Sequence, residues 1–347
     1  MDNVPRVPAS ELRGFLLAAP LDLDAAGAPA VPLAFVDLGD ASPADVTAAA
    51  RSSMVLIGVA PDGVHEEAAP LARSLAATLT VTASPGSGYP AAVEVPDIDD
   101  AVAAVAAAVA ASPRAAVTLA GLLRLTARLP VDEGMIAESL AYSMLLAGTE
   151  FASWRASRPA RPERVFAEPA VLAERDGARL RVTINRPLRH NAFGRDVRDG
   201  LVEAFDLALL DDSISDIQLG GAGASFCSGG DLDEFGSTRD VTTAHLIRLD
   251  RSIATRVHRC RERVHVELHG ACIGAGIEIP SFAADVRARD DTYIQLPELA
   301  MGLIPGAGGT VGITRRIGRW RTAYLALTGA RIGVDTALAW GLVDGRC

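Results

Sequence analysis

The sequence contains no lysine, and its 33 basic residues are all arginine. Cysteine is scarce, and the spacing of Cys227, Cys260, Cys272 and Cys347 fits no CxxC metal or redox pattern, so we expect reduced thiols in a cytoplasmic protein. The basic residues form no run, and 43 acidic residues give a net charge of −10. A nucleic-acid partner is therefore not expected, since such partners are bound through clustered positive charge.

Long apolar runs are also missing. No uncharged apolar stretch reaches the roughly 18 residues that a membrane-spanning helix needs, so no membrane partner is expected. The N-terminus is acidic early and its apolar run, FLLAAPL, is too short for a signal peptide. Apolar residues nevertheless make up 49% of the chain and charged residues 22%. This balance predicts a soluble globular protein with a large core, in one large domain or two ordinary ones.

The first half of the chain combines short apolar runs with helical segments. Residues 1–32 are rich in Ala and Pro and are predicted to be irregular. Two β-rich apolar runs follow, at 33–38 and 54–60, with a helical composition between them. Residues 1–97 are therefore predicted to form a small α/β unit. Residues 98–165 are predicted to be helical and to end in a linker rich in Pro and Arg.

The pattern changes near residue 166 and becomes strand, glycines, helix. Two strands are predicted around an Asp-Gly turn within residues 171–187. Further strands run into glycine-rich segments that open helices, as at 214–223 and 264–279. Residues 166–347 are thus predicted to be an α/β unit with backbone-rich sites at the ends of its strands.

Two glutamates stand out in the most apolar and most Gly-rich region. Glu278 lies in GIEI and Glu298 in LPEL, and neither has a cationic neighbour in sequence. Burial of an unpaired carboxylate is costly, so such residues call for a functional reason. The plain alternative is a pair of solvated helix glutamates.

Residues 166–346 resemble the crotonase (enoyl-CoA hydratase/isomerase) superfamily. Five ordered motifs carry the resemblance: INRPLRHNAF (184–193), GGAGASFCSGGDLDEF (220–235), HGACIGAGIEI (269–279), IQLPELAMGLIPGAGGT (294–310) and LTGARIGVDTALAWGLVD (327–344). The resemblance implies an α/β fold with a crotonase-like ββα spiral core. It also implies an enzyme of fatty acid metabolism that acts on acyl-CoA thioesters, assembles as a homo-oligomer (a trimer or a dimer of trimers), and needs neither a metal nor a cofactor beyond the coenzyme A of its substrate.

The resemblance also assigns roles to the motif residues. The backbone N–H groups of Gly230 and Ala275 match the oxyanion hole that stabilises an enolate-like thioester. Many relatives carry Gly where this chain has Ala275, a change that a backbone donor tolerates. Glu278 and Glu298 match the pair that holds one water beside the substrate double bond. Possession of both favours hydration; a double-bond isomerase that uses Glu298 and a non-catalytic partner subunit are the alternatives.

The remaining candidates concern binding. Arg186 and Arg189 are expected to meet the phosphates of coenzyme A, with simple surface exposure as the alternative. Asp231 is expected to hold its loop by hydrogen bonds rather than to perform chemistry. The other residues expected to line the substrate and coenzyme A site are Ser228, Gly229, Gly274 and Gly306.

Two features depart from the family pattern. In VHVELHG, His265, Glu267 and His269 alternate with apolar residues where relatives show an apolar strand, so a buried polar network, an exposed face and a lined pocket all stay open. The sequence also ends at GLVDGRC, where relatives continue into helices. Residues 92–160 resemble those helices, and we expect them to dock on the 166–347 core through an apolar stripe; an unrelated N-terminal domain is the alternative. The stripe comprises Leu122, Leu123, Leu125, Met135, Leu140, Leu145 and Leu146.

Overall fold

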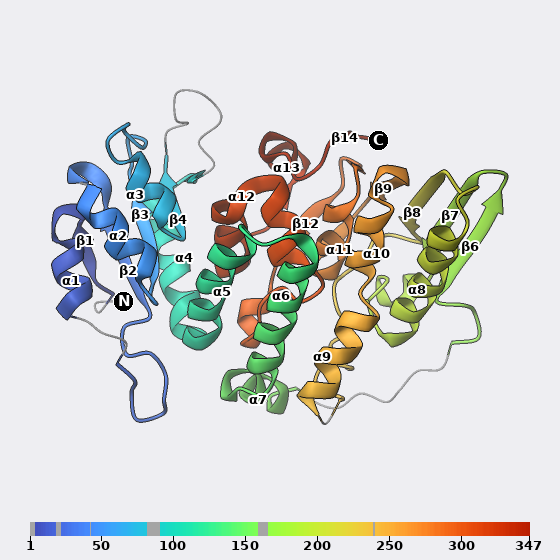
Figure 1. The fold of residues 1–347 in the computed structure, drawn as a ribbon, viewed down its shortest axis with the longest axis horizontal. Helices are drawn as coiled ribbons and strands as arrows, with labels where there is room; N and C mark the ends of the chain where they lie inside the picture. The colour runs from blue at the N-terminus through green and yellow to red at the C-terminus, as the bar shows by residue number, and fades with distance from the viewer. Residues whose placement is uncertain (1–3, 19–21, 42, 82–90, 159–165, 239) are drawn as a thin grey trace.

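Three groups of elements follow one another along the long axis of the computed structural model (Figure 1). An N-terminal α/β unit lies at one end, a set of helices follows in the middle, and the strands that come after residue 166 extend to the other end. The structure describes the whole chain except residues 1–3, 19–21, 42, 82–90, 159–165 and 239. Most of the expected linker at 157–165 therefore lies outside the described residues.

The N-terminal unit is built on a five-stranded sheet in the order β1-β2-β3-β4-β5, with every neighbouring pair parallel. Strands of parallel sheets are buried on both faces, which explains the unbroken apolar run of β3. The prediction that residues 1–32 are irregular was wrong, because β1 and α1 lie there. The elements are β1 Arg6–Pro8, α1 Leu12–Ala18, β2 Leu33–Asp37, α2 Pro43–Arg51, β3 Val55–Val59, α3 Ala69–Ser74, β4 Ala77–Thr80 and β5 Ala92–Glu94.

Four helices come next: α4 Ile98–Ala111, α5 Pro113–Thr126, α6 Val131–Leu146 and α7 Thr149–Ala156. The carboxylate of Asp97 accepts a hydrogen bond from the Asp100 backbone N–H at 2.8 Å and caps α4. Pro113 begins α5, where a missing N–H is tolerated. The extended backbone at Gly148 separates α6 from α7. No single helix among the described residues is long and apolar enough to cross a membrane; α4 and α5 reach the required length only together, with a bend of 109° between them.

The C-terminal part holds a six-stranded sheet in the order β14-β11-β9-β8-β7-β6 and a three-stranded sheet in the order β10-β12-β13. In the larger sheet only the β6–β7 hairpin is antiparallel, which confirms the predicted Asp-Gly turn. The α/β fold class is therefore confirmed. The strands are β6 Val171–Asp176, β7 Arg179–Ile184, β8 Asp216–Gly221, β9 Val264–Leu268, β10 Ala271–Ile273, β11 Asp285–Ala288, β12 Tyr293–Gln295, β13 Ile332–Gly333 and β14 Gly345–Arg346. The helices are α8 Arg195–Leu210, α9 Val241–Asp250, α10 Ile253–Arg259, α11 Ala275–Glu278, α12 Gly309–Thr328 and α13 Val334–Trp340.

Helix α12 is the element on which the parts of the chain meet. Helices α5 and α6 pack along it, and it also contacts β4 and β5 of the N-terminal unit (Figure 1). Thr126 Oγ1 donates a hydrogen bond to the Thr310 carbonyl at 2.8 Å. Of the expected apolar stripe, Leu125 and Leu140 are exposed, a correction that follows from their position on the far side of their helices. The other members are buried or half-buried: Leu122, Leu123, Met135, Leu145 and Leu146.

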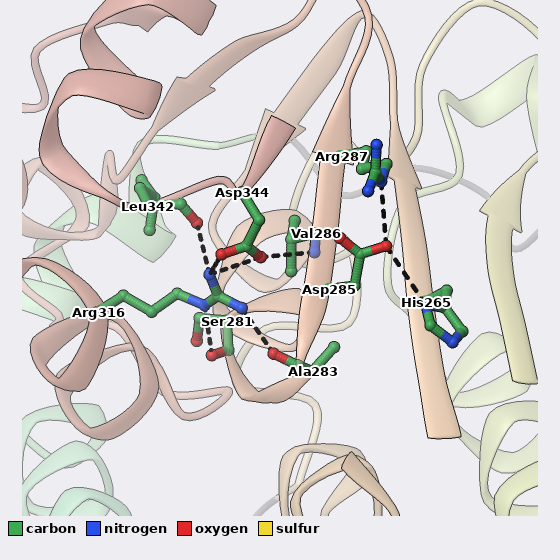
Figure 2. A network of polar contacts seen from close by, with 9 residues as sticks. All are labelled: His265, Ser281, Ala283, Asp285, Val286, Arg287, Arg316, Leu342 and Asp344. Atoms are coloured by element: carbon green, nitrogen blue, oxygen red, sulfur yellow. Dashed lines mark hydrogen bonds and ion pairs between the residues drawn. The ribbon is translucent and has the colours of Figure 1, made fainter. Parts of the chain in front are cut away.

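Strand β9 presents an exposed polar face, which decides among the alternatives for VHVELHG. His265 and Glu267 are exposed while the apolar residues between them are buried. His265 Nδ1 lies 3.3 Å from Asp285 Oδ2, and Arg287 Nε lies 3.1 Å from the same oxygen (Figure 2). His269 alone is buried, with Nε2 3.1 Å from the Gly223 carbonyl oxygen. His265 and Glu267 are therefore not part of a buried polar network.

Arg316 of α12 fixes the end of the chain beside β11 (Figure 2). Its guanidinium donates to the carbonyls of Ser281 and Ala283, at 2.9 and 2.6 Å, and lies 3.0 Å from Asp344 Oδ2. Asp344 in turn accepts a hydrogen bond from the Val286 backbone N–H at 2.8 Å. These contacts hold α12, and the loop that opens it, against the larger sheet.

Candidate active site

Two cavities meet at Gly230. One has a volume of about 530 Å³, and its walls include Gly230, Ala275, Glu278, Glu298 and Gly306. The other has a volume of about 580 Å³ and is lined by Gly230 together with Arg158, Arg189, Ser228 and Asp231. We call them the carboxylate cavity and the outer cavity. Gly230 lines both cavities.

The structure brings the two predicted glutamates together. Glu278 ends the short helix α11, and Glu298 begins a 3₁₀ turn after β12. They are 2% and 8% exposed. A Cβ atom placed on Gly274 would lie 2.5 Å from Glu298 Oε1 and 3.7 Å from Glu278 Oε1, so both carboxylates converge on one point. Gly274, with φ of +50°, leaves that space open.

The two carboxylates differ in their partners. Glu278 Oε2 accepts hydrogen bonds from the backbone N–H groups of Ala307 and Gly309, at 2.8 and 2.9 Å. Glu298 Oε2 is buried and has no hydrogen-bond partner among the described residues. Buried polar atoms are nearly always paired, and exceptions are frequent at ligand sites. Glu298 therefore keeps an oxygen available for a ligand.

Burial raises the pKa of both Glu278 and Glu298. The pKa of Glu298 is raised to about 8, mainly by burial and also by the negative charge of Glu138. The pKa of Glu278 is raised well above its ordinary value by burial first, and then by the neighbouring charges of Glu298 and Glu138. A buried set of carboxylates that cannot all ionise at neutral pH can supply a proton from one member and accept one at another.

Gly230 and Ala275 line the carboxylate cavity beside these glutamates. Their backbone N–H groups take part in no hydrogen bond among the described residues. Gly229, with φ of +93°, shapes the turn before Gly230 and accepts a hydrogen bond from the Phe193 N–H at 2.8 Å. The two unused donors have the chemistry that an oxyanion hole requires.

The two arginines that were expected to meet the phosphates of coenzyme A differ in their surroundings. Arg186 is buried, with Nη2 2.7 Å from Asp196 Oδ2 and with its guanidinium 4.6 Å from the centre of the Phe166 ring. It lines neither cavity, and its expected contact with coenzyme A is corrected to a structural one. Arg189 lines the outer cavity, where it is 2.9 Å from Asp231 Oδ1 and 2.8 Å from Asp233 Oδ2. Asp231 thus holds its loop, as expected.

Comparison with known proteins identifies the family of the chain. The model of the enoyl-CoA hydratase/isomerase family matches residues 174–347. The chain belongs to this family. Residues 174–347 accordingly carry its crotonase-like core.

Individual relatives carry different activities in their names. The trans-2-decenoyl-[acyl-carrier-protein] isomerase of Streptococcus mutans is 30% identical over 181 residues, which cover 51% of this chain and 69% of that protein. The 2,3-dehydroadipyl-CoA hydratase of Escherichia coli is 29% identical over 174 residues, or 50% and 68% of the two chains. A solved structure, the enoyl-CoA hydratase from Thermoplasma volcanium, is 31% identical over 52% of this chain and 72% of that one, with a TM-score of 0.48.

A third buried glutamate, which was not predicted, comes from the N-terminal half and binds the loop that opens α12. Glu138 of α6 is 1% exposed; Oε1 accepts from the Gly308 N–H at 2.7 Å, and Oε2 accepts from the Thr310 N–H at 2.9 Å and Oγ1 at 2.7 Å. Glu278 binds the alternate N–H groups of the same loop, so two carboxylates hold it together. A sequence signal existed, because Glu138 lies on the face of α6 that also buries Gly134 and Met135.

Replacement of Glu138 by Ala is expected to lower the free energy of unfolding by roughly 2–4 kcal/mol, because each buried donor left without an acceptor costs about 1–3 kcal/mol. Urea unfolding followed by circular dichroism measures the change. Glu133→Ala, an exposed position on the same helix, is the matched control and is expected to have little effect. Equal stability of the two variants would contradict the role given to Glu138.

The raised pKa values predict that stability falls as pH rises. The pKa of Glu298 in the folded protein is about 8 and that of Glu138 about 7, against 4.5 for an ordinary Glu, mainly because of burial. Between these values the folded state keeps protons that the unfolded chain has lost. The contribution of the two protonated carboxyl groups to the free energy of unfolding is therefore complete below about pH 4.5, and it is lost as the pH rises through about 7 to 8. Urea unfolding at about pH 6 and about pH 8.5 should give a lower free energy at the higher pH. The fall should be smaller in Glu298→Gln; an identical fall would contradict the assignment.

Proposed function

We propose that the protein hydrates an enoyl-CoA thioester, adding water across the 2,3 double bond through an enolate held in an oxyanion hole. The observation that carries the proposal is the convergence of Glu278 and Glu298 on one point of a cavity that is also lined by Gly230 and Ala275, whose backbone N–H groups have no hydrogen-bond partner among the described residues. Family membership supports the class of reaction. The carboxylate pair supports hydration within that class.

The geometry supports a simple sequence of steps. The thioester oxygen accepts hydrogen bonds from the N–H groups of Gly230 and Ala275, which stabilise the negative charge that develops there. The water oxygen bonds to C3 while one carboxylate takes a proton from that water. The other carboxylic acid gives its proton to C2, and the charge on the thioester oxygen returns to the carbonyl. One carboxyl group gains a proton and the other loses one, so the two glutamates alone balance the protons.

The outer cavity is suited to the coenzyme A part of the substrate. Because the reacting carbons must lie beside the glutamates, the thioester sits near Gly230 and the coenzyme A moiety extends into the outer cavity. Arg158 lines that cavity and offers positive charge to phosphates, whereas Arg189 there is paired with Asp231 and Asp233. The guanidinium of Arg158 lies over the ring of Trp154, 5.1 Å from its centre, which orients it without neutralising it.

A double-bond isomerase is the second candidate. It is favoured by the difference between the two carboxylates: Glu298 has a free oxygen, whereas one oxygen of Glu278 is engaged by the loop at 307–309. A single base that removes a proton from C2 and returns it to C4 would need only Glu298. One of the relatives is named as an isomerase.

The two candidates are separated by the conjugated thioester absorbance. Hydration is expected to remove the absorbance of short, long or aromatic 2-enoyl-CoAs. Isomerase activity would create that absorbance from 3-enoyl-CoAs. Absorbance gained from 3-enoyl-CoAs without any loss from 2-enoyl-CoAs would replace the proposed function with the isomerase. No change with either set would favour a non-catalytic partner subunit.

A further inference from the structure

Arg248 of α9 is a half-buried cation in the wall of the carboxylate cavity. Its Nη1 donates to the Ser139 carbonyl at 3.3 Å, to Ser139 Oγ at 2.9 Å and to Ser143 Oγ at 3.0 Å. Its guanidinium lies 4.5 Å from the centre of the Tyr142 ring. Burial lowers the pKa of Arg248, and the nearby Tyr142 and Glu138 act in the opposite direction. All of its contacts are with neutral groups.

Of the other three arginines of the cavity, Arg195 is exposed, and Arg198 and Arg251 are compensated by aspartates. Arg198 Nη2 and Arg251 Nη1 lie 2.9 and 3.6 Å from Asp199 Oδ1, and Arg251 also pairs with Asp250. No carboxylate lies within 4.0 Å of the Arg248 guanidinium among the residues that the structure describes. The charged groups that line the cavity are Arg195, Arg198, Arg248, Arg251, Glu234, Glu278 and Glu298.

Nearby acidic groups do not neutralise Arg248. Glu138 influences it electrostatically, but the carboxylate of Glu138 is bound to the N–H groups of Gly308 and Thr310. Glu234 accepts a hydrogen bond from the Arg195 N–H at 2.8 Å. A half-buried cation that has no counter-ion within 4.0 Å is costly to desolvate, so its presence in a ligand cavity points to an anion supplied by the ligand.

The position of the proposed substrate in the two cavities puts this anion on the acyl group. Gly230 belongs to both cavities, and the glutamates that flank the reacting carbons belong only to the carboxylate cavity. The acyl chain must therefore extend on the Arg248 side, away from the coenzyme A moiety. Apolar side chains, among them Phe235, Ile247 and Ile253, line this part of the cavity and suit methylene groups.

We propose that Arg248 is the centre of an anion-binding subsite and that the preferred acyl group ends in a carboxylate. The inference rests on the proposed function, since it specifies the substrate of the same site. A guanidinium fork binds a carboxylate through paired, charge-assisted hydrogen bonds. A methyl-ended chain would leave the guanidinium with its serine hydrogen bonds but without a counter-ion.

Binding of saturated acyl-CoAs tests the subsite without any turnover. Calorimetric titration of the intact protein compares two acyl-CoAs of equal chain length, one ending in a carboxylate and the other in a methyl group, over several lengths. At the best length the carboxylate-ended ligand should bind at least about tenfold more tightly, as expected for a desolvated ion pair. Equal affinities at every length, or a preference for the methyl end, would overturn the proposal. Because the ligands cannot react, failure of the hydratase assay would not mimic this result.

Variants assign the preference to Arg248. Arg248→Gln keeps an N–H donor for Ser139 and Ser143 but removes the charge, and it should abolish the discrimination between the two ligands. Arg251→Gln, at a paired position of the same cavity, is the control and should retain the discrimination. Equal weakening of both ligands by Arg248→Gln would mean that Arg248 meets the coenzyme A phosphates, and it would overturn the proposal. If Arg248→Gln does not fold, the comparison of the ligands on the unaltered protein still decides.

Discussion

Replacement of either Glu278 or Glu298 by Gln is expected to lower kcat for enoyl-CoA hydration by at least about 10²-fold, the range associated with a general acid–base group. Gln keeps the shape of the side chain but can neither accept the water proton nor deliver one to C2. The loop at 307–309 should be preserved, since the amide oxygen of the Glu278→Gln variant can still accept from the Ala307 and Gly309 N–H groups that bind Glu278. The loss should therefore appear in turnover, with little change in the circular dichroism spectrum.

The two variants also separate the candidate reactions. Loss of hydration in both supports the two-glutamate mechanism. Near-normal hydration in Glu278→Gln would favour a mechanism that depends on Glu298 alone. Near-normal activity in both would end the proposed role of the pair. Glu262→Gln, at an exposed position, is the control for the loss of one negative charge.

The parts of the site that lie within one motif could be predicted from sequence. Glycine loops and the glutamates embedded in them are local, because a turn and the residues it presents are specified by a few neighbouring positions. The structure places Gly230, Ala275, Glu278 and Glu298 on one cavity, while their catalytic roles stay predictions.

The parts that depend on distant neighbours could not be predicted. Glu138 is 170 residues away from Gly308, which donates to it, and no local pattern indicates that pairing. Arg186 lies in a predicted binding motif, yet Asp196 and the Glu168 carbonyl engage its guanidinium. The direction of a long side chain is decided by such partners rather than by its motif. Strand β1 was missed for a similar reason, since its short polar sequence becomes a strand only by pairing with β2.

The same limit applies to charge compensation. Arg198, Arg248 and Arg251 look alike in the sequence, and only the packing of α6 against α9 shows that Arg248 meets serines while the others meet aspartates. Whether an arginine has a counter-ion therefore depends on the tertiary structure. It can be decided only when all the neighbours of each guanidinium are known.

Replacement of Gly230 by Pro is expected to lower kcat by roughly 10²–10³-fold, the loss that follows removal of one oxyanion-hole donor. Pro has no backbone N–H, so the variant removes the predicted donor. A side chain at this position would also meet the ring of Phe235, which adds a steric effect. Gly230→Ala provides the control, because it introduces the same contact with Phe235 but keeps the N–H.

The comparison of the two variants isolates the donor. Both should displace Phe235, and circular dichroism and thermal unfolding should show whether each stays folded. Gly230→Ala should then retain much more activity than Gly230→Pro, since only the second lacks the hydrogen bond that strengthens as charge develops on the thioester oxygen. Equal losses would assign the effect to the displaced ring of Phe235. A folded Gly230→Pro variant with a normal rate would place the oxyanion donor elsewhere and leave Ala275 as the other predicted donor.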